Sequence, residues 1–198
     1  MLESECERID PRIRRTRQLL RDALRRLLEQ KEFDKITVQD ITEAATLNRA
    51  TFYAHYPDKF KLLEEFIRVS FLQLLAQRNV RFDGRCSSAF KAIILAVSDY
   101  LAEVQNSFSS KQHQFEPFVE ATVIDQIRQL LLCGFRSYPT ERRISEELVA
   151  ATASWAIYGA AKQWVDTPGH VSAEEFVSVA VDLVTPILMG GVEPVPKV

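Results

Sequence analysis

The sequence lacks the features of secreted, membrane-spanning and disulfide-stabilised proteins. Its 198 residues contain no run of 18 apolar residues, so we expect no transmembrane helix and no membrane partner. Residues 1–10 are acidic and hold no apolar stretch, which is unlike a secretory signal. The three cysteines, Cys6, Cys86 and Cys133, are odd in number and far apart, which argues against a disulfide framework. Together these absences favour the reducing cytoplasm as the location of the protein.

Motifs of common enzyme classes are absent as well. The sequence has no glycine-rich phosphate loop and no Gly-x-Ser-x-Gly nucleophile elbow. The three histidines, His55, His113 and His170, are scattered, whereas a metal site needs clustered His, Cys or acidic ligands. We therefore expect no enzyme, no bound metal and no cofactor.

Strand signals are also missing, and the patterns that are present are helical. No segment shows sustained alternation of apolar and polar residues, no internal repeat occurs, and no Ser/Gly linker divides the chain. Apolar residues recur instead at spacings of three and four, which predicts an all-α fold. We expect about nine helices near residues 11–29, 38–45, 48–55, 59–78, 87–105, 117–136 with an interruption near Ala121, 141–165 and 172–189, followed by a frayed tail.

Capping residues mark the starts of several of these helices. Asp10 precedes Pro11, and Thr37 with Asp40 makes a capping box, in which each side chain binds the other residue's backbone N–H. Ile36 and Ile41 flank that cap as a hydrophobic staple. Further caps are expected at Asn48, Asp58 and Ser172.

The charge distribution says more than the net charge of −2. Residues 1–62 carry 13 Lys and Arg against 11 Asp and Glu, whereas residues 63–198 carry 12 against 16. Eight arginines lie between Arg8 and Arg26. A local basic patch attracts phosphates over roughly 8–10 Å. From charge alone, a nucleic-acid contact and a solvated helix face are equally good explanations.

Residues 37–56 predict a helix-turn-helix. Two short capped helices are separated by a tight turn at Thr46-Leu47. The apolar residues expected between them are Ile41, Ala44, Ala45, Leu47, Phe52 and Tyr56. In such a pair the second helix enters the major groove with its N-terminal side chains at the base edges.

The outward-facing residues of the second helix have side chains suited to reading DNA. They are Asn48, Arg49, Ala50, Thr51 and Tyr53. Arg49 can bond guanine with two parallel hydrogen bonds, and the methyl groups of Ala50 and Thr51 can meet a thymine methyl. Tyr53, His55 and Lys59 are expected on phosphates, which fixes the register. Arg14 and Arg15 can reach phosphate or the minor groove, and a solvated face explains them equally well.

Thr37-Val-x-x-Ile41 followed by Thr51-Phe-Tyr-x-His-Tyr-x-Asp-Lys59 resembles the TetR/AcrR family of bacterial regulators. The resemblance covers residues 12–62. It implies DNA contacts at the matching positions Thr37, Gln39, Arg49, Thr51, Tyr53, His55 and Lys59. One departure is Thr46, where the family usually has glycine because the position often needs a positive φ. A non-glycine residue there costs on the order of 1 kcal/mol.

The resemblance also implies the rest of the molecule. We expect an N-terminal DNA-binding domain over residues 1–62 and a C-terminal effector-binding and dimerisation domain over residues 63–198. The implied protein is a homodimer, usually a repressor, whose double-stranded DNA operator is palindromic. The alternative is a structural or protein-interaction bundle whose helix-turn-helix no longer binds DNA.

The C-terminal part is rich in large apolar side chains. Candidates to line an apolar effector pocket are Phe66, Phe71, Phe90, Tyr100, Phe118 and Trp155, and a filled core without a cavity is the other interpretation. Residues 150–161 are a run of small residues, which permit close helix approach. Together with residues 176–188 this run is the candidate dimer interface, or else a helix buried within the chain.

Overall fold

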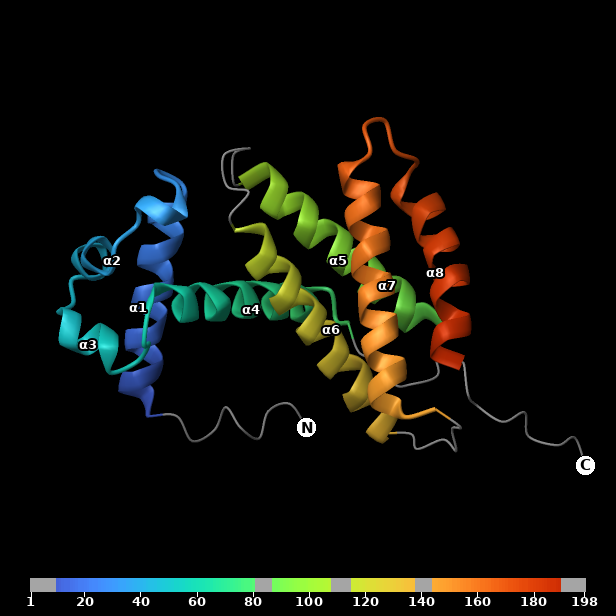
Figure 1. Ribbon diagram of the computed structural model, residues 1–198, viewed down its shortest axis with the longest axis horizontal. Coiled ribbons are helices and arrows are strands. Elements are labelled where there is room, and N and C mark those ends of the chain that lie inside the picture. The colour runs from blue at the N-terminus through green and yellow to red at the C-terminus, as the bar shows by residue number, and fades with distance from the viewer. Residues whose placement is uncertain (1–9, 81–86, 108–114, 138–143, 190–198) are drawn as a thin grey trace, which may run out of the picture. The chain divides into compact units, whose positions relative to one another are not determined.

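The computed structural model of the chain describes residues 10–80, 87–107, 115–137 and 144–189 (Figure 1). Within these ranges lie eight α-helices, one short 3-10 helix and no strand, which confirms the predicted all-α fold. The expected interruption near Ala121 is wrong, because α6 is continuous from Glu116 to Ser137. Residues 1–9 of the acidic N-terminal segment and the predicted frayed tail lie outside the described residues.

The helices fall into two compact units. Residues 1–67 and 107–118 make up the first unit, and residues 68–106 and 119–198 the second. In chain order the elements are α1 (Pro11–Leu28), the 3-10 helix η2 (Phe33–Lys35), α2 (Val38–Ala45), α3 (Arg49–Tyr53), α4 (Lys59–Gln77), α5 (Ser87–Ser107), α6 (Glu116–Ser137), α7 (Glu146–Asp166) and α8 (Ala173–Met189).

The first unit is built around the apolar faces of its short helices. Its largest fully buried side chains are Leu20, Leu24, Ile36, Ile41, Phe52, Leu62, Leu63 and Ile67. The predicted staple residues Ile36 and Ile41 are among them, and Tyr56 is 4% exposed. Burial raises the pKa of the Tyr56 hydroxyl, so this ring is a neutral core residue, as the sequence predicted.

The predicted caps are present where the structure describes them. Asp10 accepts a hydrogen bond from the Arg12 N–H at 2.8 Å, and Asp58 accepts one from the Lys61 N–H at 2.8 Å. Ser172 accepts from the Glu175 N–H at 3.3 Å. Each bond satisfies one of the N–H groups that the first turn of a helix leaves without an intrahelical partner.

In the second unit, α7 and α8 lie side by side and run antiparallel (Figure 1). Ser145 caps α7 through the Leu148 N–H at 3.3 Å, so the helix begins at Glu146 rather than near residue 141. Half of the small-residue run faces the chain's own core, with Ala150, Ala153 and Ala161 fully buried. None of the helices in the described ranges is long and apolar enough to cross a membrane.

Candidate nucleic-acid interface

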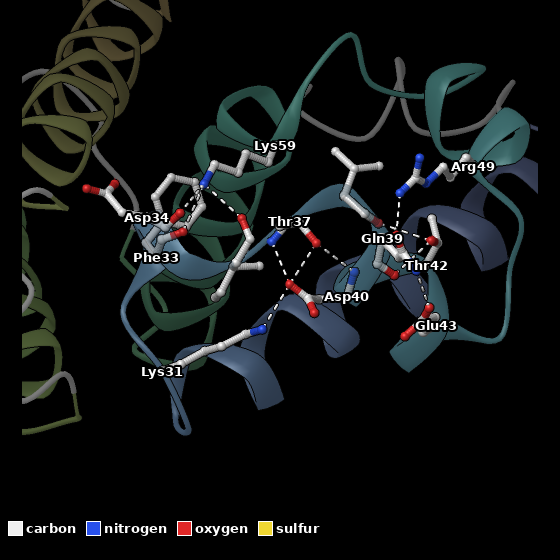
Figure 2. Close-up of polar contacts among 12 residues, drawn as sticks. Lys31, Phe33, Asp34, Thr37, Gln39, Asp40, Thr42, Glu43, Arg49 and Lys59 are labelled. Atoms are coloured by element: carbon white, nitrogen blue, oxygen red, sulfur yellow. Dashed lines mark hydrogen bonds and ion pairs between the residues drawn. The ribbon is translucent and has the colours of Figure 1, made fainter.

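The first helix of the predicted motif, α2, is held at its start by the capping box. Asp40 Oδ2 accepts from the Thr37 N–H at 2.7 Å, and the Asp40 N–H donates to Thr37 Oγ1 at 3.1 Å (Figure 2). Lys31 Nζ adds an ion pair to the same carboxylate at 2.9 Å. The hydrogen bond from Lys31, followed by those from Thr37, lowers the pKa of Asp40 to about 2. The Asp40 carboxylate is therefore charged at neutral pH and ties α2 to the end of α1.

The turn after α2 has the left-handed residue that the sequence analysis anticipated. Thr46 has φ 57° and ψ 43°. Its N–H donates to the Glu43 carbonyl at 3.1 Å, and the Leu47 N–H donates to the Thr42 carbonyl at 2.9 Å. This pair of bonds is a Schellman motif, which ends a helix when one residue adopts the left-handed conformation. The chain forms the tight turn without glycine.

The second helix, α3, presents a polar face and buries the other. Asn48 caps it by accepting from the Thr51 N–H at 2.7 Å and from the Thr51 hydroxyl at 2.9 Å. Phe52 is fully buried, whereas Tyr53 is 56% exposed. Asn48, Arg49 and Ala50 are exposed too, and Thr51 and His55 are half-buried. The predicted outward face is thus largely open to a ligand.

Arg49 is linked to α2 by hydrogen bonds between exposed side chains. Its Nη2 donates to Gln39 Oε1 at 2.5 Å, and Gln39 Nε2 donates to Glu43 Oε1 at 2.8 Å (Figure 2). Gln39 and Glu43 lie on one face of α2 because they are four residues apart. Gln39 and Arg49 are predicted from the sequence. Glu43 is not among the predicted residues, although its spacing of four from Gln39 indicates it.

Lys59 has partners other than the predicted phosphate. Its ammonium donates to the carbonyls of Phe33 at 3.0 Å, Asp34 at 3.1 Å and Ile36 at 2.8 Å (Figure 2). An ammonium has three donors, so in this conformation all of them are used. It also lies over the Phe33 ring, 4.6 Å from the centroid. Burial lowers the pKa of Lys59, and the charges of Asp34 and Asp40 oppose that effect.

The arginines of α1 divide into two groups. Arg14 and Arg15 are exposed in the first turns of the helix. Arg21 pairs with Glu65 of α4 at 2.6 Å, and Arg26 donates to the Ala44 carbonyl at the end of α2 at 2.8 Å. Part of the basic cluster therefore holds the helices of the first unit together. The sequence could not reveal the Arg21–Glu65 pair, because its members are 44 residues apart.

Comparison with known proteins identifies this arrangement. Residues 20–66 match the family described as bacterial regulatory proteins, tetR family. Over 75 residues the chain is 41% identical to the HTH-type transcriptional regulator YxbF of Bacillus subtilis (strain 168). Residues 20–66 are thus similar to the TetR family. The aligned segment is 37% of this chain and 20% of YxbF, so the resemblance to that relative is confined to a fraction of its length.

Several solved structures share the fold over most of the chain. A TetR transcriptional regulator from Streptococcus agalactiae 2603V matches with a TM-score of 0.52 and 23% identity, over 87% of this chain and 95% of that one. RolR in complex with resorcinol matches with a TM-score of 0.52 and 16% identity, over 94% and 97%. GusR of Salmonella enterica matches with 0.51 and 17%, over 92% and 98%. At these identities the likeness concerns the fold alone.

The six aromatic residues suggested for an effector pocket are divided between the two units. Phe71 and Tyr100 pack edge to face in the second unit, with ring centroids 5.3 Å apart, and Phe90 of that unit is buried. Phe66 and Phe118 belong to the first unit, where Phe118 stacks on Phe60 at 5.5 Å. Trp155 is 57% exposed on α7, so it does not line the interior of a single chain. In the described ranges, no group of three or more His, Cys, Asp or Glu residues is arranged to hold a metal ion.

Proposed function

We propose that this chain is a TetR-family protein and regulates transcription by binding double-stranded DNA through α3. The observation that carries the proposal is the two-sided character of this short helix. Phe52 anchors it in the first unit, while Arg49, Ala50 and Tyr53 stay exposed on its other side. Buried anchoring gives an exposed reading face the rigidity that base recognition needs.

Individual roles follow from the chemistry of each side chain. Arg49 would bond guanine, and the methyl groups of Ala50 and Thr51 would meet thymine. Tyr53, His55, Thr37, Asn48 and the exposed Arg14 and Arg15 would bind phosphates and sugars, which position the protein without reading sequence. Lys59 is withdrawn from this set because its three donors hold backbone carbonyls. Gln39 would act beside Arg49, to which it is bonded.

A homodimer would present two copies of α3 to a palindromic operator. In favour of this are exposed apolar side chains on both α7 and α8, namely Leu148, Trp155, Val179 and Leu183, each more than half exposed. Helices with such a face bury it against another surface, and a two-fold partner offers the same surface in return. Half-sites one helical turn apart, about 34–36 Å, then require a two-fold protein.

An apolar effector would bind in the second unit, next to the Phe71 and Tyr100 rings, and weaken DNA binding. RolR, which shares the fold, has been crystallised with resorcinol, a small aromatic molecule. Repression is the function we favour. DhaS, of the same fold with a TM-score of 0.50 and 17% identity, is an operon activator, so activation is the second candidate. A cytoplasmic location follows from a DNA partner.

Selection from a pool of DNA duplexes with a randomised central segment tests DNA binding directly. The wild-type protein should enrich one palindromic motif. Arg49→Ala should relax the preference at one base pair of each half-site by about 1–3 kcal/mol, whereas Tyr53→Ala should weaken binding to all duplexes alike. Failure of the wild-type protein to enrich any sequence would favour the alternative, a helical interaction bundle. A reporter gene behind the selected motif then separates repression from activation.

A further inference from the structure

Glu43 is an exposed carboxylate on the face of α2 that also carries Gln39. It bonds Gln39, and Gln39 bonds Arg49, so a line of two hydrogen bonds joins α2 to the first residue of α3 (Figure 2). A carboxylate beside a DNA-reading side chain is repelled by phosphates. A carboxylate at this position therefore needs a favourable function that offsets its repulsion by phosphates.

The donors and acceptors of the three side chains fit together in only one direction. A carboxylate accepts hydrogen bonds and cannot donate them, so Glu43 requires the Gln39 amide to turn its Nε2 toward it. The amide oxygen then points the other way, toward Arg49, which is a pure donor. With the amide reversed, two donors would face one another across the Gln39–Arg49 contact, and two acceptors across the Gln39–Glu43 contact. Glu43 therefore decides which atom Gln39 offers to Arg49.

The bond to Gln39 leaves Arg49 able to read a base. A guanidinium has two edges that can each give two parallel hydrogen bonds, one through Nε and one Nη and the other through both Nη atoms. A single bond from Nη2 uses a hydrogen of one edge and leaves the other edge complete. Gln39 thus restrains the plane of the guanidinium while a full bidentate edge stays available for guanine O6 and N7.

From this geometry we propose that Glu43 is a positioning residue for base recognition. Acting through Gln39, it orients the guanidinium of Arg49 and sets the strength of the base preference at the position that Arg49 reads. The inference rests on the proposed DNA-binding function. It adds Glu43, a residue without a predicted DNA contact, to the determinants of sequence preference.

The structure suggests a variant pair that separates positioning from other roles. Glu43→Ala removes the acceptor that orients Gln39. The double variant Gln39→Glu with Glu43→Gln exchanges the two residues and keeps the charge of α2. In it the carboxylate at position 39 accepts from Arg49, and the amide at position 43 donates to that carboxylate. The double variant therefore keeps both oriented hydrogen bonds, with the amide and the carboxylate exchanged between positions 39 and 43.

The experiment is the duplex selection described above, run with wild type, Arg49→Ala, Glu43→Ala and the exchanged double variant. Glu29→Ala, which removes an exposed carboxylate elsewhere in the same unit, is the matched control. Glu43→Ala should lower the guanine preference about threefold to tenfold, the factor gained by pre-ordering one long side chain. The loss should fall at the base pair that Arg49→Ala affects, and the double variant should restore most of it. Thermal unfolding should be unchanged, because Gln39 and Glu43 are exposed.

Three results would overturn the inference while leaving DNA binding intact. The first is an unchanged base preference in Glu43→Ala. The second is a change in Glu43→Ala at a different base pair from the one that Arg49→Ala affects, which would indicate a direct contact with cytosine. A uniform gain in affinity for all duplexes, unrepaired by the exchange, would show that Glu43 acts only by repelling phosphates. A wild-type protein that enriches no motif would refute the proposed function itself, and the inference with it.

Discussion

Replacing Lys59 with methionine removes an ammonium that binds three backbone carbonyls and leaves a side chain of similar length. The carbonyls of Phe33 and Ile36 are partly buried at the contact, whereas water can reach that of Asp34. A polar group left unsatisfied at such a site costs about 1–3 kcal/mol. Losing the cation–π contact with the Phe33 ring adds roughly 0.5–1 kcal/mol. We expect Lys59→Met to lower the free energy of unfolding by about 2–4 kcal/mol.

Lys61→Met is the matched control. Lys61 lies two residues further along α4 and is exposed, and its one described ion pair joins it to Glu64 at 2.6 Å. Exposed pairs of this kind contribute about 0.3–0.5 kcal/mol. Urea unfolding followed by circular dichroism measures both variants. Hydrogen exchange should show faster opening of residues 33–36 in Lys59→Met alone, because three carbonyls of this segment bind the ammonium.

DNA binding then separates the structural role of Lys59 from a phosphate contact. Each lost phosphate contact reduces the slope of log affinity against log salt concentration by about 0.9. The slope of folded Lys59→Met should equal that of the wild type, because the ammonium is engaged with carbonyls. Equal stability of Lys59→Met and Lys61→Met, together with a lower slope for Lys59→Met, would refute the assignment of Lys59 as a backbone clamp.

Three further outcomes follow from the described contacts. Thr46→Gly should raise the melting temperature by relieving on the order of 1 kcal/mol of strain in the left-handed backbone conformation. Asn79→Gly, at φ 51°, should raise the melting temperature less, because asparagine tolerates this conformation better, and equal increases would contradict this reasoning. The stabilisation by the Asp40 carboxylate is complete above the pKa of the unfolded state, near 4, and is lost as the pH falls toward 2. Asp40→Asn should therefore reduce the loss of unfolding free energy between pH 4 and pH 2, and an unchanged loss would exclude this role. Leu183→Glu should shift the protein toward monomer in sedimentation at micromolar concentration. Gln129→Glu makes an equal charge change at an exposed residue of α6 and should remain a dimer, whereas a dimeric Leu183→Glu would place the interface elsewhere.

Local sequence was enough to predict the helices and most of their starts. A cap joins residues two or three positions apart, so Thr37 with Asp40, and Asn48 with Thr51, meet whatever the rest of the chain does. The left-handed turn at Thr46 follows from the same short range, since two helices this close leave few other ways to connect. The prediction of a helix break near Ala121 was wrong. The flanking residues Val119 and Val123 are buried, and packing of these side chains favours an unbroken helix.

Which polar side chains are free to act was decided by tertiary structure. The sequence predicted Lys59 on a phosphate and left the arginines of α1 as either nucleic-acid contacts or a solvated face. In the structure Lys59 reaches carbonyls 23–26 residues away, and Arg21 reaches Glu65. Trp155 is a case of an apolar residue that turned out to be exposed. Its apolar sequence neighbours suggested an interior position, but α7 is oriented so that this side chain is 57% exposed. Helical periodicity determines which residues share a face. The long-range packing that turns this face inward or outward determines the partners that those residues meet.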